Sequence, residues 1–314
     1  MLFACQDWSP KLLKESGVSQ ENIERLAKAL VEVHDSFREA FSRPVQRTYG
    51  VVYLKGLLSD LVAKSAEPIA LRYLGPSHVR NLQRFLSVSP WDEDRLKELY
   101  QIRLHERLAH PRAVITVDST EFPKKGKESA GVARQYCGRL GKVENCQSGV
   151  FVGYTSPRGY GLVDCRLYMP ERWFSPEYAA RRQKCGVPQD LSFQTKAEIA
   201  LELLAKIRAS NRFPGRWVAF DAAFGRDPAF RDAVAALGYR YLARVPSDTQ
   251  VLTEPPRFEL PPYRGRGRPP TRPRPYPPPR TVPNSRRTLP HCGTPSPWPK
   301  EPKAPPWRNS PACG

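Results

Sequence analysis

The distribution of proline limits how much of this 314-residue chain can fold. Twenty of its 34 prolines follow residue 254. Proline lacks a backbone N–H and is excluded from helix interiors, and this stretch has almost no periodic apolar pattern. It therefore cannot bury enough apolar surface to offset the entropy of ordering it. We expect residues 251–314 to form a disordered Pro/Arg-rich tail, which confines the fold to about the first 250 residues.

Residues 1–110 have the periodicity of helices. Ser19 can cap a first helix, whose apolar residues repeat at helical spacing, and Pro44 interrupts the pattern before a second apolar stretch. A break at Gly75-Pro76-Ser77 precedes a short helix. The sequence Ser89-Pro90-Trp91-Asp92 then supplies a cap, a proline at the first helical position and an acid in the first turn of another helix. We expect an all-α N-terminal domain.

Residues 111–250 change to strands that alternate with helices. The β-branched run at 113–117 is typical of a buried strand, and a capping box at Thr195 opens a helix. The expected order is a strand, a hairpin, a helix, a strand, a helix and a strand. This order predicts an α/β domain with a mixed sheet and covering helices. The expected strands are 113–117, 149–154, 162–169, 217–220 and 239–245.

The charge of the chain points to a polyanionic partner. The formal net charge is +19, of which +9 lies in residues 251–314, so the body is basic in its own right. Nucleic acid is the first candidate partner, and a solvated basic surface is the alternative.

Seven widely spaced cysteines, with no CxxC pair, favour reduced thiols over a zinc site. No run of about 18 apolar residues occurs, so we expect a soluble, cytoplasmic protein with no membrane partner.

Two aspartates follow strands of the expected sheet. Asp118 follows the strand 113–117, and Asp221 follows the strand 217–220. The carboxyl ends of neighbouring parallel strands face one crevice, where α/β sheets place their sites. Two carboxylates held together repel each other unless a cation lies between them, and Mg²⁺ or Mn²⁺ prefers such oxygen ligands. The alternative is that each aspartate only caps the turn after its strand.

Longer motifs surround both aspartates, and they occur in order along the chain. With these motifs the chain resembles the DDE transposases of bacterial insertion sequences, in the branch with an IS4-like catalytic domain. The resemblance runs from about Phe41 to Tyr263. The motifs are Phe122-Pro123-Lys124-Lys125-Gly126-Lys127, Gly131-Val132-Ala133-Arg134-Gln135-Tyr136, Asn145-Cys146-Gln147 and Asp221-Ala222-Ala223-Phe224-Gly225-Arg226-Asp227.

The resemblance implies a ribonuclease-H-like catalytic domain at 111–250. Asp118 and Asp221 would match the first two metal-binding acids of the family's triad, at a site for two Mg²⁺ or Mn²⁺ ions that serve to cut DNA and join it to a target. The partner would be double-stranded DNA, bound by a nucleoid-associated dimer. The domain at 1–110 would recognise the transposon ends. The basic residues expected to contact phosphates near the cut are Lys124, Lys125, Lys127 and Arg134.

Arg80 and Arg84 lie on the short helix after the Gly75-Pro76 break. This helix could be the recognition helix of a helix-turn-helix motif that binds DNA. An ordinary core helix with two exposed arginines fits the pattern equally well.

The chain departs from the family after Asp221. The family's third acid is a glutamate on a helix after the fifth strand, whereas Glu254, Glu259 and Glu301 all lie in proline-rich sequence. We therefore expect no third acid, and we interpret the sequence beyond about residue 270 as a frameshifted or truncated end. Three hypotheses remain: a transposase, a catalytically inactive copy that only binds DNA and represses transposition, and an unrelated metal-dependent nuclease on the same fold.

Overall fold

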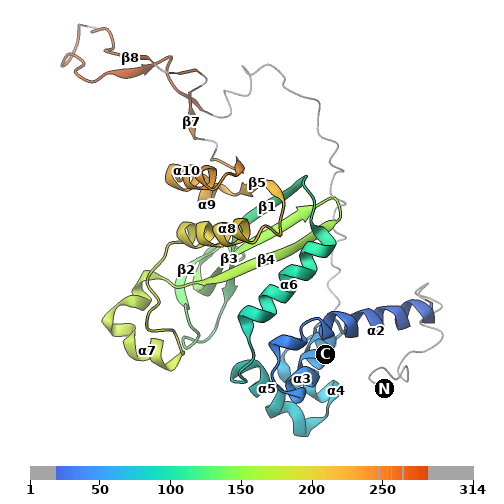
Figure 1. The fold of residues 1–314 in the computed structure, drawn as a ribbon. Helices are drawn as coiled ribbons and strands as arrows, with labels where there is room; N and C mark the ends of the chain where they lie inside the picture. Colours follow the sequence, from blue (N-terminus) through green and yellow to red (C-terminus); the bar gives the residue numbers. More distant parts are fainter. Residues whose placement is uncertain (1–18, 247, 253, 256, 264, 282–314) are drawn as a thin grey trace, which may run out of the picture. The chain divides into compact units, whose positions relative to one another are not determined.

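A computed structural model describes residues 19–246, 248–252, 254–255, 257–263 and 265–281 of the chain. The chain divides into two compact units, Met1–Arg244 and Val245–Gly314, and each is described by itself. The first unit contains a helical part followed by a sheet with its helices (Figure 1). The helical part has its own aromatic core, separate from the core of the sheet. Whether it is an independent domain ending at residue 110 stays a prediction.

The helical part consists of five α-helices and two short 3-10 helices within the residues that the structure describes. Ser19 caps the first helix as expected, because its side chain accepts a hydrogen bond from the backbone of Asn22. Pro44 is the first residue of a helix, since its missing N–H has no intrahelical partner at that position. The elements are α2 (Gln20–Asp35), η2 (Arg38–Ala40), α3 (Pro44–Leu57), α4 (Ala66–Tyr73), η3 (Pro76–His78), α5 (Val79–Ser87) and α6 (Glu93–Leu108).

The start of α6 differs from the expectation. Asp92, and not Ser89, is the N-cap, because its carboxylate accepts a hydrogen bond of 2.8 Å from the Arg95 N–H. Tertiary contacts hold the preceding residues outside the helix. The Asp92 N–H donates to the carbonyl of Ala40, and the Pro90 carbonyl accepts from the side chain of Gln46.

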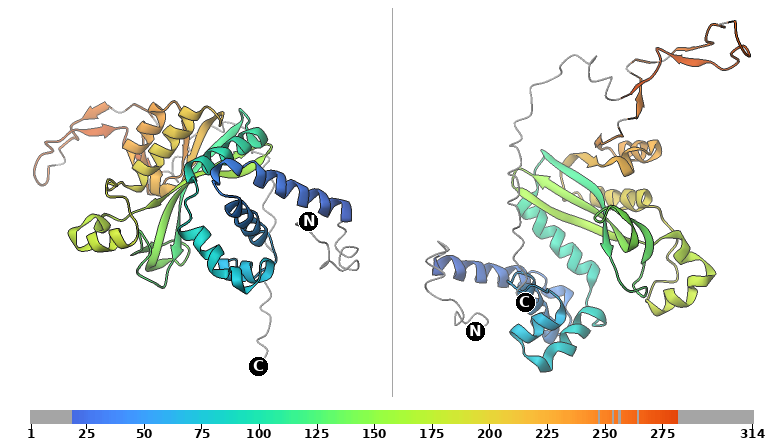
Figure 2. Two further views of the ribbon diagram at one scale, coloured as in Figure 1. Left: turned by 60° about the horizontal axis from the view of Figure 1, so that its bottom comes forward. Right: turned by 180° about the vertical axis from the view of Figure 1, so that it is seen from behind.

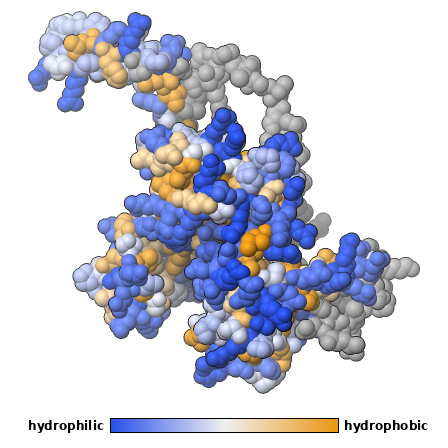
Figure 3. Space-filling view, in the orientation of Figure 1, coloured by the Kyte–Doolittle hydropathy of each residue, from blue (hydrophilic) through white to orange (hydrophobic). Residues whose placement is uncertain are grey.

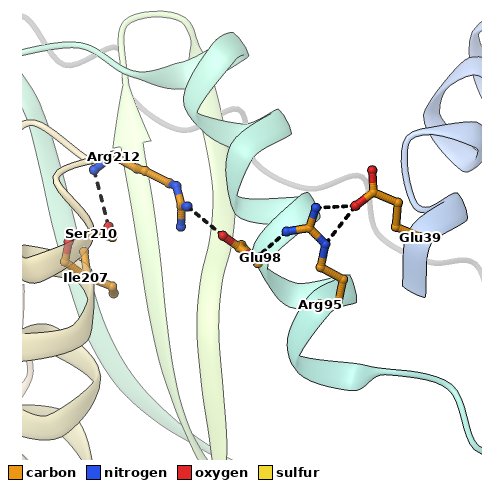
Figure 4. Close-up of polar contacts among 6 residues, drawn as sticks. All are labelled: Glu39, Arg95, Glu98, Ile207, Ser210 and Arg212. Carbon is orange, nitrogen blue, oxygen red and sulfur yellow. Dashed lines mark hydrogen bonds and ion pairs between the residues drawn. The ribbon is translucent and has the colours of Figure 1, made fainter. Parts of the chain in front are cut away.

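A chain of ion pairs along α6 connects the helical part to the sheet's helices (Figure 4). Arg95 pairs with Glu39 of η2 and, at 2.7 Å, with Glu98 of its own helix. Glu98 also accepts a hydrogen bond of 3.0 Å from Arg212. Arg212 follows the long helix that packs on the sheet, and its N–H donates to Ser210 Oγ at the end of that helix.

The main sheet has six strands, and both parallel and antiparallel pairs occur in it. Along the sheet, β3 pairs antiparallel with β1, β1 parallel with β5, and β5 parallel with β6. Both β1 and β4 pair with the same residues of β3, so they flank it. The strands are β1 (Ala113–Pro123), β2 (Ala133–Cys137), β3 (Lys142–Ser156), β4 (Gly159–Tyr168), β5 (Gly215–Phe220) and β6 (Arg240–Ala243).

This architecture confirms the fold class expected from the sequence, a ribonuclease-H-like mixed sheet with flanking helices. One strand was missed: β2 pairs with the first part of β3, which begins seven residues before the expected strand at 149–154. Ala133 and Cys137 of β2 are buried, but the inward position between them is the polar Gln135 and the aromatic Tyr136 is exposed, so the sequence lacks the apolar alternation that identifies a half-buried strand.

One face of the sheet is the core of this part. Alternate residues of the central strands, among them Ile115, Val117, Val152 and Phe220, pack against three helices. The views in Figure 2 show α8 and α10 on the same side of the sheet. The helices are α8 (Lys196–Ser210), α9 (Ala222–Gly225) and α10 (Pro228–Ala236). On the face of the molecule that carries α6 and α8, hydrophobic residues lie among hydrophilic ones (Figure 3).

The segment that connects β4 to α8 along the chain forms a small third core with the residues that precede β2. Trp173 is fully buried there with Val132 and Met169. Its elements are η4 (Glu171–Phe174), η5 (Pro176–Tyr178) and α7 (Ala179–Lys184). The sequence did not predict these elements.

The second unit contains two short antiparallel ladders within its described residues and no helix there. A two-stranded ladder consists of edge strands alone, which tolerate proline. We expected residues 251–314 to be disordered. The structure has two short ladders between residues 250 and 281, and residues 282–314 lie outside the described residues. The strands are β7 (Gln250–Val251) with β10 (Arg280–Thr281), and β8 (Arg257–Glu259) with β9 (Arg274–Tyr276).

Of the helices that the structure describes, none is both long and apolar enough to cross a membrane.

Candidate active site

Asp118 and Asp221 lie on neighbouring parallel strands of the sheet. Val117 of β1 is the Cα partner of Phe220 of β5, and each aspartate directly follows one of these two residues. The sequence predicted this neighbourhood of strands correctly. The prediction that the first strand ends at Asp118 is wrong, because β1 continues to Pro123 in its ladder with β3. Asp118 is instead the point where β1 loses its parallel partner, since β5 ends at Phe220.

The environment of Asp118 disfavours its charge. Partial burial raises the pKa of Asp118, and the negative charges of Asp221 and Glu121 raise it further. The Ser119 N–H, which donates to Asp118 Oδ1 at 2.7 Å, and the charge of Lys196 act in the opposite direction. The two predicted aspartates are therefore close enough to repel each other, and a cation between them would relieve this repulsion.

Asp221 has a second role that the sequence left open. Its carboxylate accepts a hydrogen bond of 3.0 Å from the Ala223 N–H and caps α9. The structure thus contains the cap that the alternative interpretation expected at this residue. It does not exclude metal binding, because an ionised carboxylate has two oxygens with about four acceptor positions.

Asp118 lines a shallow hollow on the sheet face opposite α8. The hollow has a volume of about 410 Å³. Gly153 leaves space in it, because a Cβ atom there would lie 2.5 Å from Thr116 Oγ1. Phe122 and Leu162 are 42% and 56% exposed, so this side of the sheet offers open access to Asp118. The hollow is lined by Thr116, Asp118, Thr120, Phe122, Phe151, Gly153 and Leu162.

A second polar cluster near Asp118 was missed by the sequence. The Glu121 side chain is only 12% exposed, and it pairs with Lys196 Nζ at 3.1 Å. It also accepts hydrogen bonds of 3.2 Å from Ser148 Oγ and from the Gly138 N–H. Lys196 is the first residue of α8 and lies 75 positions from Glu121. No spacing rule in the sequence could bring the two together.

The donor set fits a metal ion only in part. Asp118 and Asp221 supply two carboxylates that repel each other, which suits a hard divalent cation. Among the described residues, however, no three His, Cys, Asp or Glu side chains form a group that could hold a metal ion. Glu254 and Glu259 are exposed and lie outside any helix, and Glu301 lies outside the described residues.

The predicted phosphate-binding residues Lys124, Lys125 and Lys127 lie on the segment that leaves β1, and all three are exposed. Arg134 is exposed on β2 and is the Cα partner of Asn145 on β3. These residues belong to the part of the sheet that carries Asp118. Their contact with DNA stays a prediction.

Arg80 and Arg84 lie elsewhere, on α5 of the helical part. Both are exposed, whereas Leu82 and Phe85 of the same helix are buried. The helix α4, the turn at Gly75 and α5 are arranged as a helical pair with a tight turn, since Gly75 has a φ of 92°. This arrangement is compatible with both interpretations of the two arginines.

Comparison with known proteins identifies the family. Residues 36–300 match the family described as DDE superfamily endonuclease. The chain belongs to this family. The match extends past residue 270, where the sequence motifs fade, and includes part of the proline-rich segment. It supports an endonuclease and leaves the frameshift interpretation a prediction.

The similarity to a curated protein agrees with this family assignment. The chain is 29% identical over 202 residues to a protein of Microchaete diplosiphon named "Probable transposase for insertion sequence element IS701". The aligned region covers 62% of this chain and 48% of the relative, so the chain spans about half the length of the relative. The resemblance to insertion-sequence DDE transposases is thereby confirmed.

Proposed function

We propose that this DDE superfamily member acts on double-stranded DNA as an insertion-sequence transposase. It would bind the ends of the element, and Asp118 and Asp221 would take part in cutting the phosphodiester backbone and joining it to target DNA. The observation that carries the proposal is the position of the two aspartates after paired residues of the parallel strands β1 and β5. The basic body supports DNA as the partner.

Asp118 and Asp221 are the residues that would hold Mg²⁺ or Mn²⁺. Such an ion polarises a phosphoryl oxygen and lowers the pKa of bound water, which supplies a nucleophile near neutral pH. The chain's own contribution is to hold two carboxylates at fixed positions. The β1–β3 ladder, in which Asp118 is the Cα partner of Phe151, fixes the backbone at Asp118, and the α9 cap fixes the orientation of Asp221.

A second candidate is a DNA-binding protein that does not cut. It is favoured by the missing third acid, because the described residues contain no group of three metal-binding side chains. Losing the ligand of one ion in a two-ion site removes stabilisation of one reacting oxygen, a contribution of several kcal/mol. Each 1.36 kcal/mol changes the rate about tenfold. We therefore expect this chain to bind DNA and to cut it at no useful rate.

The deciding experiment measures cleavage of a transposon-end duplex in Mg²⁺ and in Mn²⁺. It compares the chain with Asp118→Ala and with a version whose downstream reading frame has been restored. We expect binding by all three proteins and cleavage by the restored version alone. Cleavage by the unrepaired chain that is lost in Asp118→Ala would refute the inactive copy and support an active enzyme. Absence of DNA binding at low salt would contradict both candidates.

A further inference from the structure

The motif Asn145-Cys146-Gln147 is placed by the structure against the basic segment that follows β1. Asn145 Nδ2 donates hydrogen bonds to two carbonyls of this segment, that of Lys124 at 2.7 Å and that of Gly126 at 2.9 Å. The backbone of Asn145 adds a third contact, because its carbonyl accepts from the Lys124 N–H at 2.9 Å. One side chain thus fixes both ends of the Lys124–Gly126 turn.

Gln147 holds the next part of the same segment. Its Nε2 donates to the carbonyl of Ala130 at 2.5 Å. Asn145 and Gln147 alternate with the buried Cys146 along β3, so their side chains project on the same face of the strand. They contact the segment at positions four residues apart, 126 and 130.

The small third core holds the segment from its other end. Trp173 Nε1 donates to the Val132 carbonyl at 2.9 Å, and Cys185 Sγ donates to the Glu128 carbonyl at 2.9 Å. We call residues 124–132 the basic loop. Five of its nine carbonyls, those of residues 124, 126, 128, 130 and 132, therefore accept hydrogen bonds from side chains on β3 or in the third core.

The side chains of the basic loop remain available to a ligand. Lys124, Lys125 and Lys127 are all exposed. Among the described residues, none of the three has an ion-pair partner, whereas Glu128 of the same loop pairs with Lys184 at 2.6 Å. Arg134 adds a fourth exposed cation on the strand beside Asn145.

We propose that Asn145 and Gln147 are positioning residues, which hold the basic loop so that its lysines bind DNA phosphates beside Asp118. The inference rests on the proposed DNA-binding function and names how the chain presents its cations. A loop that is ordered before binding loses less conformational entropy when it engages the backbone of the duplex. Neither residue touches the reacting atoms.

The test uses neutral substitutions of similar shape in the full chain. Asn145→Leu and Gln147→Met remove the amide donors without adding charge. Gln101→Met is the matched control, because Gln101 Nε2 donates to the Val163 carbonyl at 3.2 Å on a different strand. The measurement is the salt dependence of binding to a duplex, in which each lost phosphate contact lowers the slope by about 0.9.

We expect the Asn145→Leu/Gln147→Met variant to lower this slope by about 1 to 3. That range corresponds to the loss of between one and three lysine contacts. A variant with Lys124, Lys125 and Lys127 all changed to Ala should show a similar slope. Combining the two sets should add no further decrease, because the amides act through the lysines. Gln101→Met should retain the slope of the unchanged chain.

Limited digestion with trypsin tests the loop without DNA. The removal of the amides should increase the rate of cleavage after Lys124, Lys125 and Lys127 at least several-fold relative to Gln101→Met. An unchanged cleavage rate would overturn the proposal. The proposal would also be overturned if the lysine variant lowered the salt slope and the Asn145→Leu/Gln147→Met variant did not. In that case the proposed DNA binding would still hold. If the unchanged chain binds no duplex, the proposed function fails, and the digestion alone decides whether the amides hold the loop.

Discussion

Gly225→Ala is a direct test of how the sheet positions Asp221. Gly225 is the last residue of α9, the four-residue helix that Asp221 caps, and its N–H donates to the Asp221 carbonyl at 2.8 Å. A Cβ atom at this position would lie 2.3 Å from the carbonyl oxygen of Arg244 and 3.4 Å from Ala243 Cβ. The close approach of α9 to the end of β6 therefore requires glycine.

The magnitude follows from what the added methyl group meets. Its nearest neighbour is the backbone carbonyl oxygen of Arg244, directly after β6, which cannot rotate away as a flexible side chain would. The helix must then move outward, and it carries Phe224, which is only 3% exposed in the main core. Overpacking of a well-packed site costs about 1–3 kcal/mol, and a backbone obstacle places this variant near the upper end, at about 2–3 kcal/mol. For a folded body of this size such a loss lowers Tm by roughly 5–10 °C.

The assay is chemical and thermal unfolding of the full chain, with Gly126→Ala as the matched control. A Cβ atom at Gly126 meets no atom within 4 Å, so this variant should stay within about 0.5 kcal/mol of the unchanged chain. A Gly225→Ala variant that is as stable as the control would refute the reasoning, because it would mean that α9 does not pack against Arg244 as the structure has it.

Three further predictions concern the charges and the small third core. Asp221→Asn should lower the pKa of Asp118, because it removes a like charge that raises this pKa. Carboxyl NMR titration measures the shift, and an unchanged pKa would mean that the two carboxylates do not interact. The guanidinium of Arg166, which binds Glu202 at 2.5 Å, holds the pKa of Glu202 well below its ordinary value of 4.5. A depressed folded-state pKa stabilises the fold above the unfolded value and loses this effect as the pH falls through the folded one. Glu202→Gln should therefore lower the free energy of unfolding by about 1 kcal/mol at neutral pH. Measured by urea unfolding, the difference in this free energy between the variant and the unchanged chain should become smaller below about pH 4.5. A difference that becomes larger in acid would contradict the pairing of Glu202 with Arg166. Trp173→Phe keeps the buried ring but leaves the Val132 carbonyl without its donor, which should cost about 1–3 kcal/mol; Trp217→Phe, at a position 38% exposed, should be nearly neutral in the same unfolding measurement.

The strands of the core could be predicted because burial on one face imposes a pattern. Ile115 and Val117 alternate with Thr116, and the structure buries the first two completely or nearly so. The sequence of β2 lacked this pattern, because the polar Gln135 takes an inward position and the aromatic Tyr136 an exposed one, and the pairing of β2 depends on the ladder with β3. The start of α6 was misplaced for a similar reason. A contact of Asp92 with Ala40, 52 residues earlier, decides which residue caps the helix.

The candidate site, like the fold, could be predicted from the sequence only in part. Asp118 and Asp221 could be predicted because each follows an apolar run with the pattern of a buried strand, and the parallel pairing of β1 with β5 brings the two positions together. Glu121 and Lys196 could not, because their contact depends on how the first turn of α8 sits over the sheet. The hydrogen bonds of Asn145 with the Lys124 and Gly126 carbonyls could not be predicted from the sequence either. The sequence showed only that the two motifs occur in order.

The two faces of the sheet explain why Asp118 can carry a function. On one face, Val117 and Val152 are buried among apolar side chains under the helices. Asp118 projects on the other face, so the core does not require an acid at this position. A carboxylate whose pKa is raised by burial and by Asp221 destabilises the fold wherever it is ionised. A cation between Asp118 and Asp221 would relieve this penalty, which is the condition expected of the metal-binding site that we propose.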